Sequence, residues 1–382
     1  MLSRKRTLRA GSLAFALVAI AVSSASAHPV GSPVVGHAYV DDNTLVSNTV
    51  AAFDRHADGS LTPTPGSPFA TGGVGSGVGL ASQGAIQLSR DGRFLLAVDA
   101  ASNQISVLRV GWDGVPVPVG APVSSGGVDP VSIAVSGNLV YVANAGGTAT
   151  NVTVFFLAPW GGLYELPGST VALPADGVPG DVLADPTGRR LVVTLVNTST
   201  IASYEVRWGG RLVPAPGSPI AAQGPGPFGA EFRPTNPSQL FVSNAHGGTG
   251  NGTVSAFSVG FDAALTSIGA SPFADQQTAP CWVEISHDGR FLFAVNTGSG
   301  EISSYAINPD GSLALIGSTP FGSAGAGAVD ARLSPDGRTL LVDGSKAGVV
   351  ASFAVSGGNL TELPSSPTPL PVGAVASGIA VN

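Results

Sequence analysis

The sequence predicts an all-β fold built from repeated units, and three observations support this prediction. Short apolar runs of strand length alternate with turns, in a chain that holds 53 Gly and 30 Pro among 382 residues. Hydrophobic residues make up 43% of the chain and charged residues only 11%, which suits a large core. One unit recurs roughly every 45–56 residues, close to the period of four-stranded propeller blades. These features together predict a β-propeller.

Residues 285–305 show the repeated unit most clearly (I-S-H-D-G-R-F-L-F-A-V-N-T-G-S-G-E-I-S-S-Y). Asp288-Gly289 is expected to form a two-residue hairpin turn, because Gly tolerates a positive φ. Residues 291–295 and 302–305 have the composition of strands. Other copies start at Leu88, Ala184 and Leu333.

The unit occurs seven times. The second strand of each unit is expected to begin near Ala38, Phe94, Leu139, Leu191, Leu240, Phe291 and Leu340. A Ser/Pro-rich connection ends each unit and gives the same count, at residues 66–69, 120–123, 168–171, 217–220, 270–273, 318–321 and 366–369. We therefore predict a seven-bladed β-propeller over residues 37–382.

The two ends of this region are complementary. Residues 378–382 (G-I-A-V-N) resemble the first strand Ser132-Ile-Ala-Val-Ser136, whereas residues 37–40 are a second strand with no first strand before it. We expect the C-terminal strand to pair with residues 37–40, because ring closure removes exposed sheet edges.

The N-terminal segment predicts export. Residues 1–27 combine a basic start, an apolar run too short to span a bilayer, and the small-residue site Ala25-Ser26-Ala27. We interpret them as a secretory signal peptide followed by a lead-in over residues 28–36. No other apolar run is long enough to span a membrane, so the mature protein is expected to be secreted. Cys281 is the only cysteine, which excludes an internal disulfide.

The net charge of the chain restricts the classes of partner that it is expected to bind. The formal net charge is −7, and it becomes about −11 without the four basic residues of the predicted signal peptide. Such a chain is not expected to bind nucleic acid or anionic lipid. The five histidines have no metal-ligand spacing, so we expect no metal or cofactor; a bound ion would be Ca²⁺ or Mg²⁺ held by oxygen atoms. The protein is expected to be a monomer.

The repeats resemble those of the lactonase-type seven-bladed propellers, a group with bacterial 6-phosphogluconolactonase, fungal carboxymuconate cyclase and secreted YVTN-repeat proteins. The resemblance rests on the Asp-Gly-Arg turns and on strands such as Leu139-Val-Tyr-Val-Ala-Asn144 and Phe291-Leu-Phe-Ala-Val-Asn296. The resemblance implies the propeller fold and a lactonase-type activity. It also implies an Arg, a His and a Glu at positions where this sequence has Phe228, Gly229 and Ala245. Neither Gly nor Ala can transfer a proton or carry a charge.

The first strands supply another set of polar residues. Their alternation places Asp181, Trp282 and Asp330 at one level of the predicted channel, and Glu231, Glu284 and Arg332 two residues further along. These residues line the channel as ordinary polar groups or form a site in which Arg332 orients an anion and carboxylates move protons. The catalytic candidates are Asp181, Glu231, Glu284, Asp330 and Arg332.

Two further features concern binding. Loops 144–151 and 244–252 are rich in Asn, Gly and Thr, and long propeller loops are common binding sites. The ligand-binding candidates are Asn144, Asn197, Asn244, His246, Trp282 and Asn296. Trp112, Trp160 and Trp208 lie in turns next to outer strands, where they either pack at blade edges or form an aromatic rim for a partner or glycan.

Two functions from different classes remain. The first is an exported, non-catalytic module that binds a protein, a glycan or a small polar ligand. The second is a lactone hydrolase or cyclase with a rearranged channel site. The residues at positions 228, 229 and 245 favour the first function, and the resemblance along the whole chain supports the second.

Overall fold

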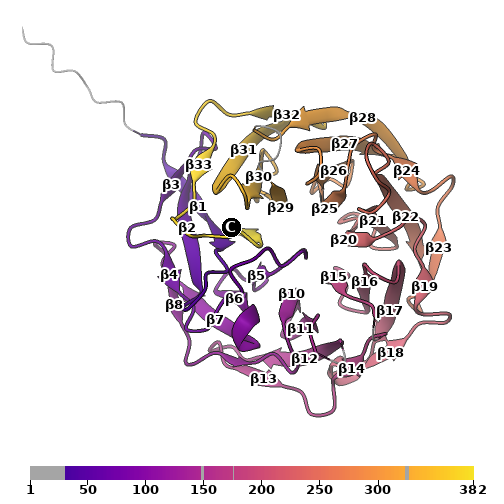
Figure 1. The fold of residues 1–382 in the computed structure, drawn as a ribbon, viewed down its shortest axis with the longest axis horizontal. Helices are drawn as coiled ribbons and strands as arrows, with labels where there is room; N and C mark the ends of the chain where they lie inside the picture. Colours follow the sequence, from indigo (N-terminus) through magenta and orange to yellow (C-terminus); the bar gives the residue numbers. More distant parts are fainter. Residues whose placement is uncertain (1–30, 148–149, 175, 323–326) are drawn as a thin grey trace, which may run out of the picture. The chain divides into compact units, whose positions relative to one another are not determined.

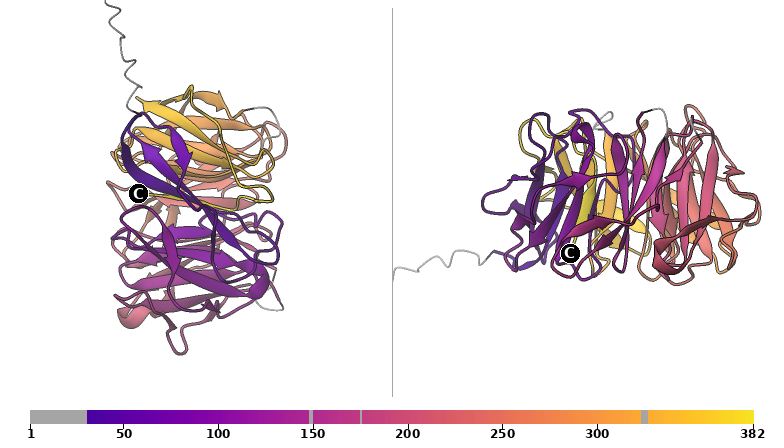
Figure 2. Two further views of the ribbon diagram at one scale, coloured as in Figure 1. Left: turned by 90° about the vertical axis from the view of Figure 1, so that its left-hand side faces the viewer. Right: turned by 90° about the horizontal axis from the view of Figure 1, so that it is seen from below.

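Seven antiparallel sheets follow one another around a ring in the computed structural model (Figure 1). The structure describes residues 31–147, 150–174, 176–322 and 327–382, so the predicted signal peptide lies outside the described residues. The ring is formed by the unit Pro33–Asn382. The edge-on views of Figure 2 show strands running between the two faces of this ring, with turns at each face. The all-β, seven-bladed prediction is confirmed.

Each sheet is one blade, and the blades are numbered here in chain order. Blade 1 contains β1 (Val34–Asp41), β2 (Thr49–His56), β3 (Leu61–Pro63), β4 (Phe69–Ala70) and the C-terminal β34 (Ile379–Val381). Blade 2 contains β5 (Ile86–Leu88), β6 (Phe94–Asp99), β7 (Gln104–Val110), β8 (Pro116–Pro118) and β9 (Val123–Ser124). Blade 3 contains β10 (Pro130–Ser136), β11 (Leu139–Asn144), β12 (Asn151–Leu157), β13 (Leu163–Glu165) and β14 (Val171–Ala172).

The remaining blades repeat this order. Blade 4 contains β15 (Pro179–Ala184), β16 (Arg190–Leu195), β17 (Thr200–Val206), β18 (Leu212–Pro214) and β19 (Ile220–Ala221). Blade 5 contains β20 (Pro227–Phe232), β21 (Gln239–Asn244), β22 (Thr253–Val259), β23 (Leu265–Ser267) and β24 (Phe273–Ala274). Blade 6 contains β25 (Pro280–Ile285), β26 (Phe291–Asn296), β27 (Glu301–Ile307) and β28 (Leu313–Pro320). Blade 7 contains β29 (Ala328–Leu333), β30 (Thr339–Gly344), β31 (Val349–Ser356), β32 (Asn359–Glu362) and β33 (Thr368–Pro369).

Short 3-10 turns occur at η1 (Ala100–Ser102) and η2 (Trp208–Gly210). Over the residues that the structure describes, no helix has the length and apolar character needed to cross a bilayer.

The two ends of the propeller meet in blade 1, as the sequence predicted. β34 pairs with β1 in antiparallel register, with Ala38 opposite Val381, Tyr39 opposite Ala380 and Val40 opposite Ile379. β1 begins at Val34, so the strand starts three residues before the expected first residue His37.

The turn at Asp288-Gly289 is longer than the expected two-residue hairpin. Gly289 has the expected positive φ of 68°, but the Ser286 N–H bonds to Phe291 O, so four residues lie between these two strand positions. The Ser286 hydroxyl donates to Asp288 Oδ1 over 2.6 Å and accepts the Phe291 N–H over 2.9 Å. These side-chain bonds satisfy backbone and carboxylate groups inside a wider loop, which the Gly alone does not reveal.

The Ser/Pro-rich connections have a structural role. In six blades the chain forms a fourth strand, leaves the sheet, and returns as a two-residue strand on the same third strand. In five of these six blades, a connection serine accepts the third-strand N–H that this break would leave without an acceptor, whereas blade 2 has Ala121 at this place. Examples are Ser67 with the Ala52 N–H at 2.9 Å and Ser271 with the Ala256 N–H at 2.8 Å. The repeated serine therefore completes the hydrogen bonding of the outer sheet.

The core consists of seven apolar clusters between blades, with one main cluster at each junction. The junction between blades 7 and 1 illustrates the pattern, since Phe53 and Ile379 of blade 1 pack with Leu341 and Val350 of blade 7. Cys281 is buried with a free thiol, and burial raises its pKa to about 11. Each blade therefore depends on a neighbour on both sides.

Ile379→Ala tests the closing strand. Because Ile379 is fully buried in the last apolar junction, its truncation should lower the free energy of unfolding by about 2–5 kcal/mol. Equilibrium urea denaturation measures this change. The control is Val372→Ala at a fully exposed position, which should stay within about 0.5 kcal/mol of the unmodified protein. Equal stability of the two variants would contradict the importance of the closing strand.

Candidate functional site

The first strands of neighbouring blades contact one another and surround the central channel. Along each of them, alternate residues face the same side, so polar residues two positions apart form successive levels. Asp181 and Asp330 belong to the first level. Glu231, Glu284 and Arg332 follow on β20, β25 and β29.

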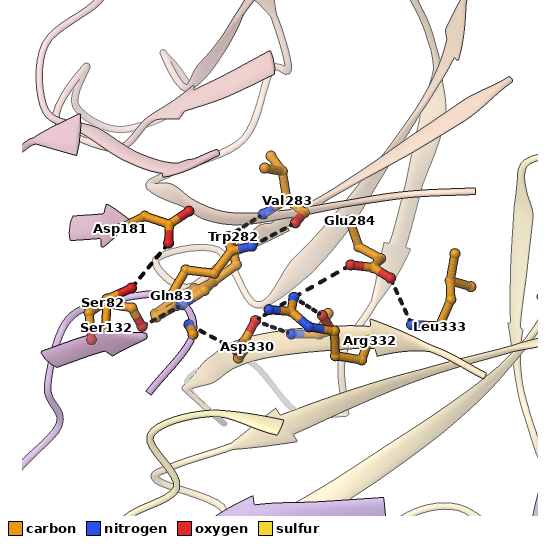
Figure 3. A network of polar contacts seen from close by, with 12 residues as sticks. Ser82, Gln83, Ser132, Asp181, Trp282, Val283, Glu284, Asp330, Arg332 and Leu333 are labelled. Carbon is orange, nitrogen blue, oxygen red and sulfur yellow. Dashed lines mark hydrogen bonds and ion pairs between the residues drawn. The ribbon is translucent and has the colours of Figure 1, made fainter. Parts of the chain in front are cut away.

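Arg332 is the centre of this polar cluster (Figure 3). Its Nη1 lies 3.4 Å from Glu284 Oε2 and 3.3 Å from Asp330 Oδ1, and it donates to Ala331 O over 2.9 Å. Glu284 Oε1 also accepts the Leu333 N–H over 3.0 Å. One guanidinium therefore links carboxylates from two adjacent blades.

Asp181 is held on the opposite side of the channel by neutral donors. Its Oδ1 accepts a hydrogen bond from the Ser132 hydroxyl over 3.2 Å, and its Oδ2 accepts the Ala230 N–H over 3.0 Å. Asp181 thus connects blades 3, 4 and 5.

The cluster holds more acidic groups than its single cation can balance. Burial raises the pKa of Asp181 to about 8, and burial raises the pKa of Glu284 to about 7 although Arg332 lowers it. Burial and the Glu284 carboxylate raise the pKa of Glu231, and burial raises that of Asp330 against the effect of Arg332. Burial lowers the pKa of Arg332, but its carboxylate neighbours outweigh this effect and raise it. Carboxyl groups of the channel therefore keep a proton near neutral pH.

The structure brings the five catalytic candidates together, since each of the other four influences the charge state of Glu231. Among the described parts of the chain, no group of three or more His, Cys, Asp or Glu side chains is arranged to hold a metal ion.

A segment that was not predicted from the sequence enters this channel. Residues 82–84, which we call the crossing segment, belong to the connection between β4 and β5, and Figure 1 shows this connection reaching the middle of the ring. The Gln83 side chain donates to Val283 O over 3.1 Å and accepts the Val283 N–H over 3.2 Å. The Trp282 indole N–H donates to Ser82 O over 2.9 Å.

The crossing segment contacts four blades other than its own, and Figure 3 shows its contacts with Trp282 and Val283 of blade 6. The Gln83 N–H bonds to Gly180 O in blade 4, and Gly84 O accepts the Ile133 N–H in blade 3. The Gly84 N–H donates to Asp330 Oδ2 in blade 7 over 3.3 Å, and Gln83 reaches blade 6. Ser82 and Gln83 are buried, so this level of the channel is filled by protein.

The sequence contained one signal of this segment. Fifteen residues separate β4 from β5, whereas five separate β9 from β10 and five separate β24 from β25. An unusually long connection with a Gln just before a first strand is the feature that could have identified it.

The crossing segment occupies the space beside Gly229. A Cβ atom at position 229 would lie 2.1 Å from Gln83 Oε1 and 2.7 Å from Cys281 O. Phe228 packs edge-to-face on Trp282, with ring centroids 5.3 Å apart. The mouth of the channel at blade 5 is thus apolar and filled.

The ligand-binding candidates fall into two groups. Asn197 and His246 are exposed in turns. Trp282 is buried, as are Asn144, Asn244 and Asn296, which donate to Ser125 O, Ser255 Oγ and Ser303 Oγ respectively. These asparagines complete the ends of their blades and have no surface to offer a ligand.

The comparisons with known proteins agree with this architecture. The family model described as Lactonase, 7-bladed beta-propeller, matches residues 28–175 and 232–374. No curated protein matches the sequence. A protein from Bacteroides uniformis ATCC 8492 described as a candidate 6-phosphogluconolactonase has a similar structure, with a TM-score of 0.73 and 19% identity over 92% of this chain and 100% of its own. The periplasmic gluconolactonase PpgL of Pseudomonas aeruginosa has a TM-score of 0.70 and 18% identity, over 91% and 98% of the two chains. At such identities the likeness concerns the fold.

Gln83→Ala tests the crossing segment. Removal of the amide leaves the buried N–H and C=O of Val283 without their partners, so the free energy of unfolding should fall by about 1–3 kcal/mol. Urea denaturation measures the effect. Gln104→Ala is a control at a half-buried glutamine on β7, and it should have a smaller effect. An unchanged stability of Gln83→Ala would contradict the two-point contact.

Asp181→Asn tests whether Asp181 keeps its proton near neutral pH. Asp181 keeps its proton to a higher pH in the folded state than in the unfolded state, so its contribution to the free energy of unfolding falls as pH rises from about 4 to 8. The variant cannot ionise and should reduce this slope by up to about 1.4 kcal/mol per pH unit. Urea denaturation across this pH range measures the slope.

The control is Asp310→Asn, because a hydrogen bond from Ser312 lowers the pKa of this exposed carboxyl. The pKa shift of Asp310 has the opposite sign to that of Asp181, so this control should not reduce the slope. A slope left unchanged by Asp181→Asn would show that its carboxyl titrates alike in both states.

Proposed function

Because this chain belongs to the lactonase family of seven-bladed β-propellers, we propose that it is a non-catalytic, ligand-binding member of that family. The observation that carries this proposal is the crossing segment. A substrate needs open space beside the reacting groups, and Gln83 and Gly84 fill the channel next to Gly229 and Asp330. Their hydrogen bonds to four blades hold them there.

The match to the family model supports the same conclusion. The model covers the chain on both sides of residues 176–231 but not this stretch. The unmatched stretch contains Phe228 and Gly229, where the family resemblance implies an Arg and a His. In this proposal the chain departs from its family at the positions of the catalytic groups.

The electrostatics of the cluster favour a structural role. Asp181 bonds to blades 3 and 5, and Arg332 joins the carboxylates of blades 6 and 7. The hydrogen bonds of Asp181 and the ion pairs of Arg332 together fix the positions of neighbouring first strands. In this proposal the channel residues stabilise the ring, and ligands bind outside the channel.

Export is part of the proposal. The signal-like composition of residues 1–27 supports a mature protein that works outside the cytoplasm. The proposed protein acts as a monomer. Its partner is a protein, a glycan or a small polar ligand, and no cofactor is required.

A lactone hydrolase or cyclase is the second candidate, and one observation favours it. Burial raises the pKa of Glu284 to about 7, and this carboxyl lies 3.4 Å from Arg332. A carboxyl that can exchange a proton near neutral pH beside an anion-binding guanidinium suits acid–base catalysis.

Hydrolysis of sugar and aliphatic lactones, followed through the release of acid, separates the two candidates. We expect the purified protein to leave the whole panel at the uncatalysed rate, because the channel has no space for substrate beside Gly229. Lactone turnover by the protein would contradict the binding function. In that case Arg332→Ala and Glu284→Gln identify the site: loss of turnover with unchanged circular dichroism would assign the reaction to the channel.

A further inference from the structure

One turn recurs in six blades with the same hydrogen bonds. It joins the third strand to the fourth, and its first N–H bonds to the carbonyl four residues later, while its fourth N–H bonds back to the first carbonyl. The turns begin at His56, Gly111, Ala158, Arg207, Gly260 and Asn308. Because every blade is antiparallel and has the same strand order, these turns lie at one face of the ring, near its outer edge.

Four successive turns, in blades 2 to 5, carry an aromatic residue at the tip. Trp112, Trp208 and Phe261 occupy the second position of their turns, and Trp160 occupies the third. We call these four residues the aromatic rim. The equivalent second positions in blades 1 and 6 are Ala57 and Pro309. The rim is therefore confined to one arc of the propeller.

The rim does not serve the packing of the blades. Trp112 is 96% exposed, Trp208 is 99% exposed and Phe261 is 89% exposed, while Trp160 is 60% exposed. A side chain left in water gains no hydrophobic stabilisation from folding. Of the two interpretations of these tryptophans, edge packing therefore fails for Trp112 and Trp208, and contact with a partner remains.

Two of the turns that carry the rim, in blades 2 and 3, accept hydrogen bonds from the preceding blade. Arg93 and Arg109 of blade 2 donate to Pro159 O over 2.9 Å and to Trp160 O over 3.2 Å. The Tyr39 hydroxyl of blade 1 donates to Gly114 O over 3.1 Å. At these two turns the aromatic ring projects from a backbone bonded to the neighbouring blade, which reduces the entropy lost when a ligand binds.

Polar hollows accompany the rim at the blade junctions. A hollow of about 600 Å³ at the junction of blades 1 and 2 is lined by Trp112, Asp54 and Asp113. Another of about 420 Å³ at the junction of blades 4 and 5 is lined by Trp208, Phe261 and Arg189. Between them, hollows of about 420 and 290 Å³ occur at the junctions of blades 2 and 3 and blades 3 and 4. Rim aromatics line the hollows at the junctions of blades 1 and 2 and of blades 4 and 5. The two hollows between them are lined by other residues, among them Asp91 and Asn138 in one and Ser169 and Arg211 in the other.

We infer that the aromatic rim binds an extended, neutral polysaccharide, with sugar rings stacked on the aromatic side chains and hydroxyl groups bonded in the hollows. This inference rests on the proposed binding function and names its ligand. Four exposed aromatic residues on consecutive blades, with hollows at the blade junctions, fit a polymer of similar units. Flat, rigid aromatic rings fit the apolar faces of sugar rings, and the polar groups beside them fit hydroxyls.

The charges of the arc indicate a neutral chain. Arg207 lies 2.5 Å from Glu205, and Arg93 lies 3.7 Å from Asp91. The four hollows together are lined by five arginines and four carboxylates (Arg90, Arg189, Arg190, Arg207, Arg211, Asp54, Asp91, Asp113 and Glu205). The arc therefore lacks the excess of positive charge that an anionic polymer would require. A protein partner fits less well, because protein interfaces have a continuous apolar centre, whereas the rim aromatics stand on separate blades.

The test is native affinity electrophoresis of the purified protein in gels that contain hydroxyethylcellulose, xyloglucan, galactomannan or soluble starch, with pull-down on insoluble cellulose and chitin. We expect at least one polysaccharide to retain the protein. The triple variant Trp112→Ala, Trp208→Ala, Phe261→Ala should bind at least tenfold more weakly. Its circular dichroism and melting temperature should be unchanged, because these side chains are exposed.

Pro309→Ala is the matched control, since it changes the same turn in blade 6, where the rim is absent. This control should bind as well as the unmodified protein. The inference is overturned if no polysaccharide retains the protein, or if the triple variant is retained equally. Sedimentation velocity provides a third outcome. Self-association that depends on the rim would show that the rim binds a second copy of this chain, and it would overturn the inference. The lactone assay reports on the channel and the gels report on the rim, so either proposal can fail alone.

Discussion

The pairing of β34 with β1 is the constraint on which the rest of this structure depends. Three residue pairs join strands that are more than 330 residues apart in the chain. They complete the sheet of blade 1 and place Ile379 in the apolar junction with blade 7. Every blade then has a neighbour on both sides, so no sheet face remains exposed to water. Closure also fixes the first strands around the channel, and thereby the geometry of every residue that points into it.

The channel shows how buried charge is managed in such a ring. Asp181, Glu284 and Asp330 are buried, Glu231 and Arg332 are half-buried, and an isolated charge in such surroundings would be costly. The structure lowers this cost through hydrogen bonds from Ser132, Ala230 and Leu333 and through raised carboxyl pKa values near neutrality. The crossing segment adds neutral amide groups from Gln83 and Gly84 to the same network. The result is a polar network along the channel that connects five blades of the ring.

A filled channel changes which parts of the molecule can meet a ligand. The fold is retained at 18–19% identity to the lactonase-like structures, because backbone hydrogen bonds and apolar junctions tolerate many side chains. The position next to the crossing segment is Gly229, and its lack of a Cβ allows Gln83 to approach. At the outer edge of the ring, turns of four consecutive blades carry exposed aromatic residues. The axis of the ring is thus occupied by protein, and the exposed aromatic side chains lie at its periphery.

The sequence predicted the features that depend on local pattern. Repeat spacing determined the seven blades, alternation placed Asp181, Asp330 and Arg332 on the channel, and the likeness of residues 378–382 to a first strand identified the closing strand. Local pattern was insufficient where contacts are distant: Gln83 meets Val283 across 200 residues, and no periodicity relates them. Spacing likewise could not show that Asn144 and Asn296 are buried or that Trp112 and Trp208 are exposed. Strand period and turn chemistry are local, so the fold and the ring of polar residues could be predicted from the sequence alone. Burial depends on segments that only folding brings together, so the groups that can reach a ligand are known only from the folded molecule.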